Sequence, residues 1–273
     1  MKTNFTRIFI LLLLPVLFYT ACKKNTATPA PTTATKTDYG TISSQLAVTF
    51  YKSITGQYGG ANIGKGVTSP FSAKVGGSAA SVTSPLCGFV VDTSYSYSVH
   101  SNIKRSPFDT TYTYSGSFRL AYTCSGGAVN GYVVDDSLGY NEQTYIAFNN
   151  SSNVGQHYTV KTLDPTGKLL SMNGSINTYV NLIGEFNESG SSFRAAYKLA
   201  GLTVNYGSGT ADVTTGVATF HMVYTIYSVV LPPNPTTVYD GTIEFLGNHK
   251  ARLTINPGHV YIVDLTTGVA TPV

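Results

Sequence analysis

Residues 101–110 are a polar stretch, and on either side of it lies a segment in which apolar or aromatic residues alternate with polar ones. These two segments restrict the fold more than any other feature of the chain. The stretch reads SNIKRSPFDT, as a loop would, and the numbers of its two ends sum to 211. Opposed residues in an antiparallel hairpin have numbers with a constant sum, so Val91 should oppose Leu120 and Asp92 should oppose Arg119. One face is then apolar and aromatic, and the other carries hydroxyl groups and one charge pair. Because a slip of one residue would exchange the faces, the sequence predicts this register.

The same test predicts a three-stranded meander near the C-terminus. Loops at 247–249 and 256–258 oppose Glu244 to Arg252 and Ala251 to Val263, with the odd positions facing the core throughout. Between the two ends of the chain, a turn at 187–190 reverses the strand 180–186 into the strand 193–199.

That turn places Glu185 near Arg194. Residues 220–227 are apolar at both alternating sets of positions, which is typical of a central strand.

One segment has the period of an amphipathic helix. Its apolar residues recur every fourth position, at Ile42, Leu46, Phe50 and Ile54. Asp38 or Thr41 can cap its start, and Gly56 ends it. We expect a helix over residues 38–56 that lies on one face of the sheet.

Composition agrees with a β-rich exported domain, because only 11% of the residues are charged while Gly and Tyr number 27 and 20. The prediction is a single all-β domain, residues 38–273, with about ten to twelve antiparallel strands in meander order and one N-terminal helix. Periodicity leaves a sandwich, a barrel and a half-barrel open.

Two short sequences recur within this domain. ADVTTGVATF at 211–220 returns as VDLTTGVATP at 263–272, and SGSFRLAY at 115–122 returns as SGSSFRAAY at 189–197. Their separations differ, so no solenoid or propeller period follows. We interpret them as repeated turn chemistry.

The first 37 residues carry an export signal and a tether. Lys2 and Arg7 precede an apolar run, residues 8–18, which is too short to span a bilayer. The box Tyr19-Thr20-Ala21 and Cys22 follow. This arrangement resembles a bacterial lipoprotein precursor, although an ordinary secretory signal is the alternative.

The resemblance implies removal of residues 1–21 and acylation of Cys22, with a diacylglycerol on the sulfur and a third chain, such as palmitate, on the amine. Residues 22–37 then form a Thr-, Ala- and Pro-rich tether. Lys23 follows the lipidated residue, which resembles an outer-membrane address. Some lipoproteins that are exported to the cell surface carry an acidic run just after the lipidated cysteine, and this chain has no such run. We therefore expect the protein on the periplasmic face rather than on the cell surface.

Charge and cysteine usage agree with this location. Five of the 17 Lys and Arg residues precede Asp38, whereas all 13 Asp and Glu residues lie from Asp38 onward, so the folded part has 12 basic and 13 acidic residues and a net charge of −1. That balance argues against a nucleic-acid partner. With Cys22 lipidated, Cys87 and Cys124 remain, and their numbers also sum to 211. We expect a disulfide in an oxidising compartment, the alternative being two buried thiols.

The sequence contains no recognisable catalytic, metal-binding or cofactor motif. What remains is a group of tyrosines near the tip of the first hairpin, Tyr95, Tyr97, Tyr112 and Tyr114, with Lys104 and Arg105 in the loop beyond. Such a group can form a platform for a sugar or a peptide. The alternative is core packing under the helix or a second sheet.

We therefore expect a lipid-anchored, non-enzymatic binding or structural lipoprotein of the cell envelope. Its partners would be the membrane, through the anchor, and a glycan, a lipid or an envelope protein. One alternative is an acyl-chain or lipid carrier, since a curved sheet covered by a helix resembles the half-barrel of periplasmic lipid carriers. The other is a hydrolase whose carboxylates come from distant strands.

Lipidation of Cys22 is directly testable. The mature protein from its native host should begin at residue 22 and exceed its polypeptide mass by three acyl chains and glycerol, as measured by intact mass spectrometry. The variant Cys22→Ser should lose this added mass and leave the membrane fraction. An unmodified thiol on the native protein would contradict the assignment.

Overall fold

The computed structural model describes residues 38–67, 70, 87–101, 110–144, 149–184, 189–206, 211–228 and 235–273. Cys22, Lys104, Arg105 and Glu185 lie outside the described residues, and the expectations for the first three stay predictions.

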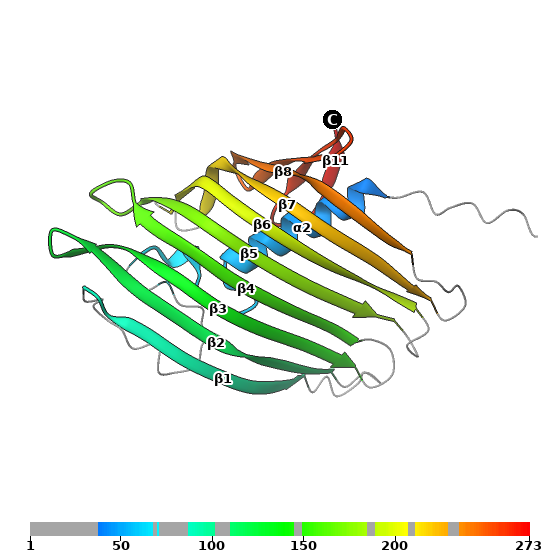
Figure 1. Ribbon diagram of the computed structural model, residues 1–273, viewed down its shortest axis with the longest axis horizontal. Coiled ribbons are helices and arrows are strands. Elements are labelled where there is room, and N and C mark those ends of the chain that lie inside the picture. The colour runs from blue at the N-terminus through cyan, green and yellow to red at the C-terminus, as the bar shows by residue number, and fades with distance from the viewer. Residues whose placement is uncertain are drawn as a thin grey trace, which may run out of the picture. The chain divides into compact units, whose positions relative to one another are not determined.

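The described chain is one antiparallel sheet of eleven strands in sequence order, with one α-helix on one of its faces (Figure 1). The strands are β1 (Val90–Ser101), β2 (Thr110–Ser125), β3 (Ala128–Thr144), β4 (Asn149–Thr162), β5 (Leu169–Ile183), β6 (Ser189–Asn205), β7 (Asp212–Ser228), β8 (Thr236–Gly247), β9 (Lys250–Ile255), β10 (His259–Asp264) and β11 (Ala270–Pro272). The predicted all-β meander is confirmed. Of the three architectures left open, the described strands form neither a two-sheet sandwich nor a sheet closed by pairing of β1 with β11.

The first hairpin has the predicted register. Val91 opposes Leu120 and Asp92 opposes Arg119, whose side chains approach to 4.0 Å on the exposed face. Cys87 and Cys124 are joined by a disulfide with 5.6 Å between their Cα atoms. The alternation of apolar and hydroxyl-bearing residues thus sets the pairing of β1 with β2.

The C-terminal meander also has the predicted register, with Glu244 opposite Arg252 and Ala251 opposite Val263. Arg252 donates to the Glu244 carboxylate at 2.8 Å. A further short strand, β11, pairs with β10 and was not predicted.

In the middle of the chain, β5 and β6 form a hairpin as predicted, but Ile183 opposes Gly190, so β6 begins before the predicted turn 187–190 has ended. Arg194 opposes Tyr179, so the predicted pairing of Arg194 with Glu185 was wrong. Strand β7 lies between β6 and β8 as a central strand.

The helix α2 (Tyr39–Ile54) follows from its sequence. Asp38 caps it by accepting hydrogen bonds from the backbone N–H groups of Gly40 and Thr41 at 3.0 and 3.3 Å. Just beyond its end, Gly56 has a φ of 69°, a left-handed conformation that favours glycine. Within the described part of the chain, no helix has the length and hydropathy needed to cross a bilayer.

The apolar stripe of α2 packs on the inner face of the sheet, as predicted. Leu46, Phe50 and Ile54 are completely buried there, and α2 contacts β5, β9, β10 and β11 (Figure 1). Two side chains of the sheet also reach the helix backbone. Tyr197 donates to the carbonyl of Leu46 at 3.1 Å, and Gln156 donates to the carbonyl of Ser53 at 2.8 Å.

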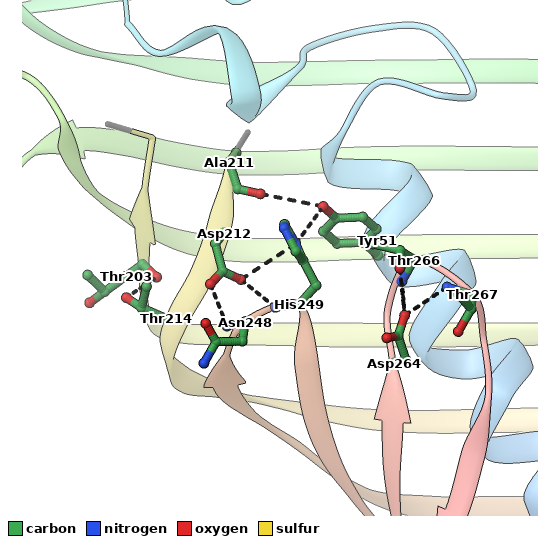
Figure 2. A network of polar contacts seen from close by, with 10 residues as sticks. All are labelled: Tyr51, Thr203, Ala211, Asp212, Thr214, Asn248, His249, Asp264, Thr266 and Thr267. Carbon is green, nitrogen blue, oxygen red and sulfur yellow. Dashed lines mark hydrogen bonds and ion pairs between the residues drawn. The ribbon is translucent and has the colours of Figure 1, made fainter. Parts of the chain in front are cut away.

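A polar network ties the second half of the helix to the C-terminal strands (Figure 2). Asn248 and His249 form the turn between β8 and β9 with φ values of 53° and 54°, as a type I′ turn requires. The Asp212 carboxylate accepts hydrogen bonds from both of their backbone N–H groups, at 2.6 and 2.9 Å. Tyr51 of α2 lies 3.2 Å from the His249 ring and donates to the carbonyl of Ala211 at 3.4 Å. One carboxylate therefore stabilises a turn that positions the helix.

The recurring sequences are not repeated turns, so that interpretation was wrong in part. Around Asp264 the sequence does form a turn, in which its carboxylate accepts hydrogen bonds from Thr266 and Thr267, and these bonds lower its pKa. The matching sequence from Asp212 belongs to strand β7 instead, where Asp212, Val213 and Thr215 pair with β6, and β8 pairs with β7 from Val217 onward.

Both copies of the second sequence lie in strands. Phe118 and Phe193 face the core, as do Tyr122 and Tyr197, while the arginines between them point to the opposite face. This sequence repeats a strand pattern.

The disulfide should contribute measurably to stability. It joins residues 37 positions apart, and the chain-entropy model gives about 3 to 4 kcal/mol for such a loop. We expect reduction to lower the free energy of unfolding by about that amount in denaturant titrations. The double variant Cys87→Ala/Cys124→Ala should match the reduced protein and should not respond to reductant. An unchanged unfolding midpoint would contradict this prediction.

Candidate functional site

The predicted tyrosine group exists, and it extends across three strands instead of two. Register places Tyr97 of β1, Tyr114 of β2 and Tyr140 of β3 in one row on the inner face. The ring centroids of Tyr97 and Tyr114 are 5.1 Å apart in a stacked arrangement, and those of Tyr114 and Tyr140 are 5.2 Å apart. The ring centroids of Tyr112 and Tyr140 are 6.4 Å apart in a stacked arrangement, and those of Tyr95 and Tyr97 are 6.2 Å apart.

Sequence reasoning missed Tyr140 because of a β-bulge. The turn Gly126-Gly127 would oppose Tyr114 to Gly139 if pairing continued without interruption from Ser125 and Ala128. A register shift between Thr123 and Cys124 moves every later pair by one residue, so Tyr114 opposes Tyr140. The glycine pair marks the turn in the sequence, whereas nothing in the sequence marks the bulge.

Two of these tyrosines line a cleft between α2 and the inner face of the sheet. The cleft has a volume of about 450 Å³, which lies within the usual range for small-molecule sites. Its aromatic wall is formed by Tyr114 and Tyr140, with Phe193 further along the same transverse row. The polar side of α2 forms the opposite wall through Ser44, Gln45, Val48, Thr49 and Lys52. We call this space the tyrosine cleft.

Hydrogen-bonding groups are arranged around its aromatic wall. Tyr140 donates to the Glu142 carboxylate at 3.0 Å, and its pKa is raised by burial and by that carboxylate. The side-chain carbonyl oxygens of Gln45 and Asn150 are buried without a hydrogen-bond partner. Buried polar atoms are normally paired, so these two carbonyls offer sites for a ligand or water.

The tyrosine cleft has the chemistry of a binding site. Its aromatic surfaces suit the flat apolar side of a ring, and its amides, hydroxyl groups and charges suit polar substituents. Hydrolysis of a glycoside usually needs two carboxyl groups, and among the described lining residues Glu142 is the one carboxylate.

A second polar group is buried deeper on the same face. Asp136 of β3 lies beneath Gly60, where an added Cβ would come within 2.5 Å of its carboxylate. Burial raises the pKa of Asp136 to about 8, and the neighbouring Asp135 carboxylate adds to the shift. The backbone N–H groups of Gln156 and Ala61 act in the opposite direction without cancelling it.

Tyr95 belongs to this buried group and not to the tyrosine cleft. Its hydroxyl group lies against Gly59, and burial together with the Asp136 carboxylate raises its pKa. The hydroxyl groups of Tyr95 and Tyr158 and both oxygens of Asp136 make no hydrogen bond of ordinary geometry. The predicted platform therefore divides into Tyr114, which lines the cleft, and Tyr95, which belongs to the core.

The histidines lie apart from one another. His221 and Asp240 pair at 2.8 Å on the open face of the sheet, and His249 belongs to the turn that Asp212 stabilises. No three His, Cys, Asp or Glu residues of the described ranges gather as metal ligands would.

Comparison with known proteins identifies no relative: no family model, no curated protein and no solved structure matches the chain. The class of the protein is therefore stated from its own structure, as a single antiparallel sheet of eleven strands with a helix packed on one face.

The buried carboxyl group predicts a pH dependence. The folded protein holds the Asp136 proton up to about pH 8, whereas an ordinary aspartate, with a pKa of 3.8, releases it. Between these values the unfolded state binds fewer protons, so stability falls as pH rises. We expect this group to lower the free energy of unfolding by about 4 kcal/mol between pH 5 and pH 9.

Denaturant titrations at several pH values would measure this effect. The variant Asp136→Asn, which stays neutral throughout, should remove most of the decrease. Asp135→Asn, on the exposed face of the same strand, is the matched control and should retain most of it. If the free energy of unfolding fell equally with pH in the native protein and in Asp136→Asn, the carboxyl group would be ionised in the folded state.

Proposed function

We propose that the protein is a lipid-anchored, non-enzymatic binding lipoprotein of the cell envelope, attached through Cys22 on the periplasmic face of the outer membrane. The tyrosine cleft is its ligand site. The observation that carries the proposal is the combination, in one space of about 450 Å³, of a tyrosine wall with two buried carbonyl oxygens that lack partners. The export signal supports the location.

The ligand is a neutral sugar of one or two rings. The Tyr114 and Tyr140 rings can pack against the C–H face of a sugar, while the carbonyls of Gln45 and Asn150 accept hydrogen bonds from its hydroxyl groups. A fully apolar ligand would leave both carbonyls without partners and would gain nothing from them. A sugar satisfies them.

The other two functions have less support. An acyl-chain carrier needs an apolar cavity on the inner face, and here Leu46, Phe50 and Ile54 of α2 occupy that position. A glycoside hydrolase needs a second carboxyl group beside Glu142, and the described lining of the cleft has none.

Calorimetric titration of the folded domain with neutral mono- and disaccharides tests the proposal. The variant Tyr140→Ala should weaken binding about five- to tenfold, because it removes an aromatic contact and releases Glu142. Tyr140→Phe keeps the ring and should lose less affinity. The matched control is Tyr227→Ala on the opposite face, where the hydroxyl group of Tyr227 pairs with Ser192 at 2.7 Å.

Two results would contradict the proposal. One is equal binding by the native protein and Tyr140→Ala, provided that both unfold at similar temperatures. The other is a stoichiometric, non-covalently bound lipid on protein purified from its native host, detected by native mass spectrometry in addition to the acyl chains on Cys22, which would favour the carrier.

A further inference from the structure

A groove crosses the open face of the sheet, opposite α2 and the tyrosine cleft. Two hollows, with volumes of about 1030 and 340 Å³, share Asn177, Ala196 and His221 and so form one continuous depression. The floor is a transverse row of residues paired from strand to strand, Ser137, Gly155, Asn177, Ala196, His221 and Asp240. Neighbouring strands lie about 4.8 Å apart, so a floor across β3 to β8 extends about 24 Å.

Small residues make the depression. Gly155 and Ala196 have little or no side chain, whereas long side chains lie two residues away from the floor along β5 and β6. Tyr179 and Arg194 form one wall, and Lys198 stands on the other. Arg194 and Lys198 lie two residues to either side of Ala196 on the same face of β6, about 13 Å apart along the strand. An extended chain can therefore lie across β6 between two cations.

The charges of this groove favour an anion. Its described lining contains Arg194, Lys198 and the pair His221 and Asp240. The Asp240 carboxylate already accepts a hydrogen bond from the His221 ring at 2.8 Å. The Arg194 guanidinium lies over the Tyr179 ring, 5.0 Å from its centroid, which restricts its orientation. Two cations thus remain for a ligand, in a folded part whose net charge is −1.

The hydrogen bonding of the sheet backbone favours a glycan over a peptide as the ligand of this groove. At the floor residues of β4 to β7, each strand pairs with both neighbours, so these positions leave no backbone donor or acceptor for a peptide that crosses them. The groove offers side-chain donors instead, such as the Asn177 amide and the guanidinium of Arg194. A carboxylate can pair with that guanidinium in bidentate fashion. Sugar hydroxyl groups suit the amides.

We propose that this groove binds a linear acidic glycan, a chain of uronate sugars, with its carboxylates at Arg194 and Lys198 and its hydroxyl groups over the floor. This is a second site, independent of the tyrosine cleft and of its neutral ligand. The groove lies on the face away from α2, so both sites can be occupied at the same time.

Calorimetric titration of the folded domain at low salt tests the proposal. The probes are linear tetramers of galacturonate, mannuronate and glucuronate, and each is compared with its methyl-esterified, uncharged form. At least one acid should bind, and its ester should bind at least tenfold more weakly. Arg194→Ala and Lys198→Ala should each weaken binding about tenfold, since each removes one charge-assisted contact. Ala196→Phe should block the groove.

The matched control is Lys161→Ala, which removes a cation from the same open face outside the groove. It should bind as the native protein does, and so should Tyr140→Ala, which alters the tyrosine cleft alone. Thermal unfolding of each variant checks its folding, and Arg194→Gln replaces Arg194→Ala if the latter is unstable. Failure of all three acids to bind overturns the proposal, as does equal binding of acid and ester or an equal loss in Lys161→Ala. The effect of Tyr140→Ala on neutral-sugar binding tests the tyrosine cleft alone and has no bearing on the groove.

Discussion

Burial of the apolar stripe of α2 against the inner face of the sheet is the contact on which the rest of the structure depends. A single sheet has two faces, and an apolar face must be covered to be stable in water. Here α2 and the segment that follows it, in which Gly59 and Gly60 lie against the sheet, provide the cover, and Leu46, Phe50 and Ile54 are completely buried as a result. The opposite face stays open and is polar along most strands. This asymmetry creates two different environments on one sheet.

The two proposed sites follow from that asymmetry. The tyrosine cleft forms where α2 presents its polar side to the inner face, and its walls therefore come from a helix and a sheet. The groove on the open face forms in the sheet alone, because register aligns Gly155 and Ala196 beside taller side chains. Transverse rows of paired residues account for both sites, although the residues in each row are far apart in the sequence.

Much of the strand pairing was predictable because local rules govern it. Alternation and loop position determine the register of a hairpin whose pairing has no interruption, which holds for β1 with β2 and for β9 with β10. In β8 and β9 the register shift lies beside the turn, between Phe245 and Gly247, and the pairs beyond it keep the predicted register. The same rules fail at the bulge beside Cys124, so Tyr140 was absent from the predicted site. They also fail for the recurring sequence at Asp212 and Asp264, since the flanking strands decide whether it forms a strand or a turn.

The sequence by itself determined the all-β class, the helix and its cap, the disulfide partners and the register of the regular hairpins, because each depends on the spacing of neighbouring residues. Tertiary structure alone decided that the strands form one sheet, that α2 occupies its inner face, and that Asp136 is buried there. It also decided which tyrosines meet in the cleft and which small residues align in the groove. These features depend on contacts between residues far apart in the sequence, and a shift of one residue at a bulge changes which side chains meet.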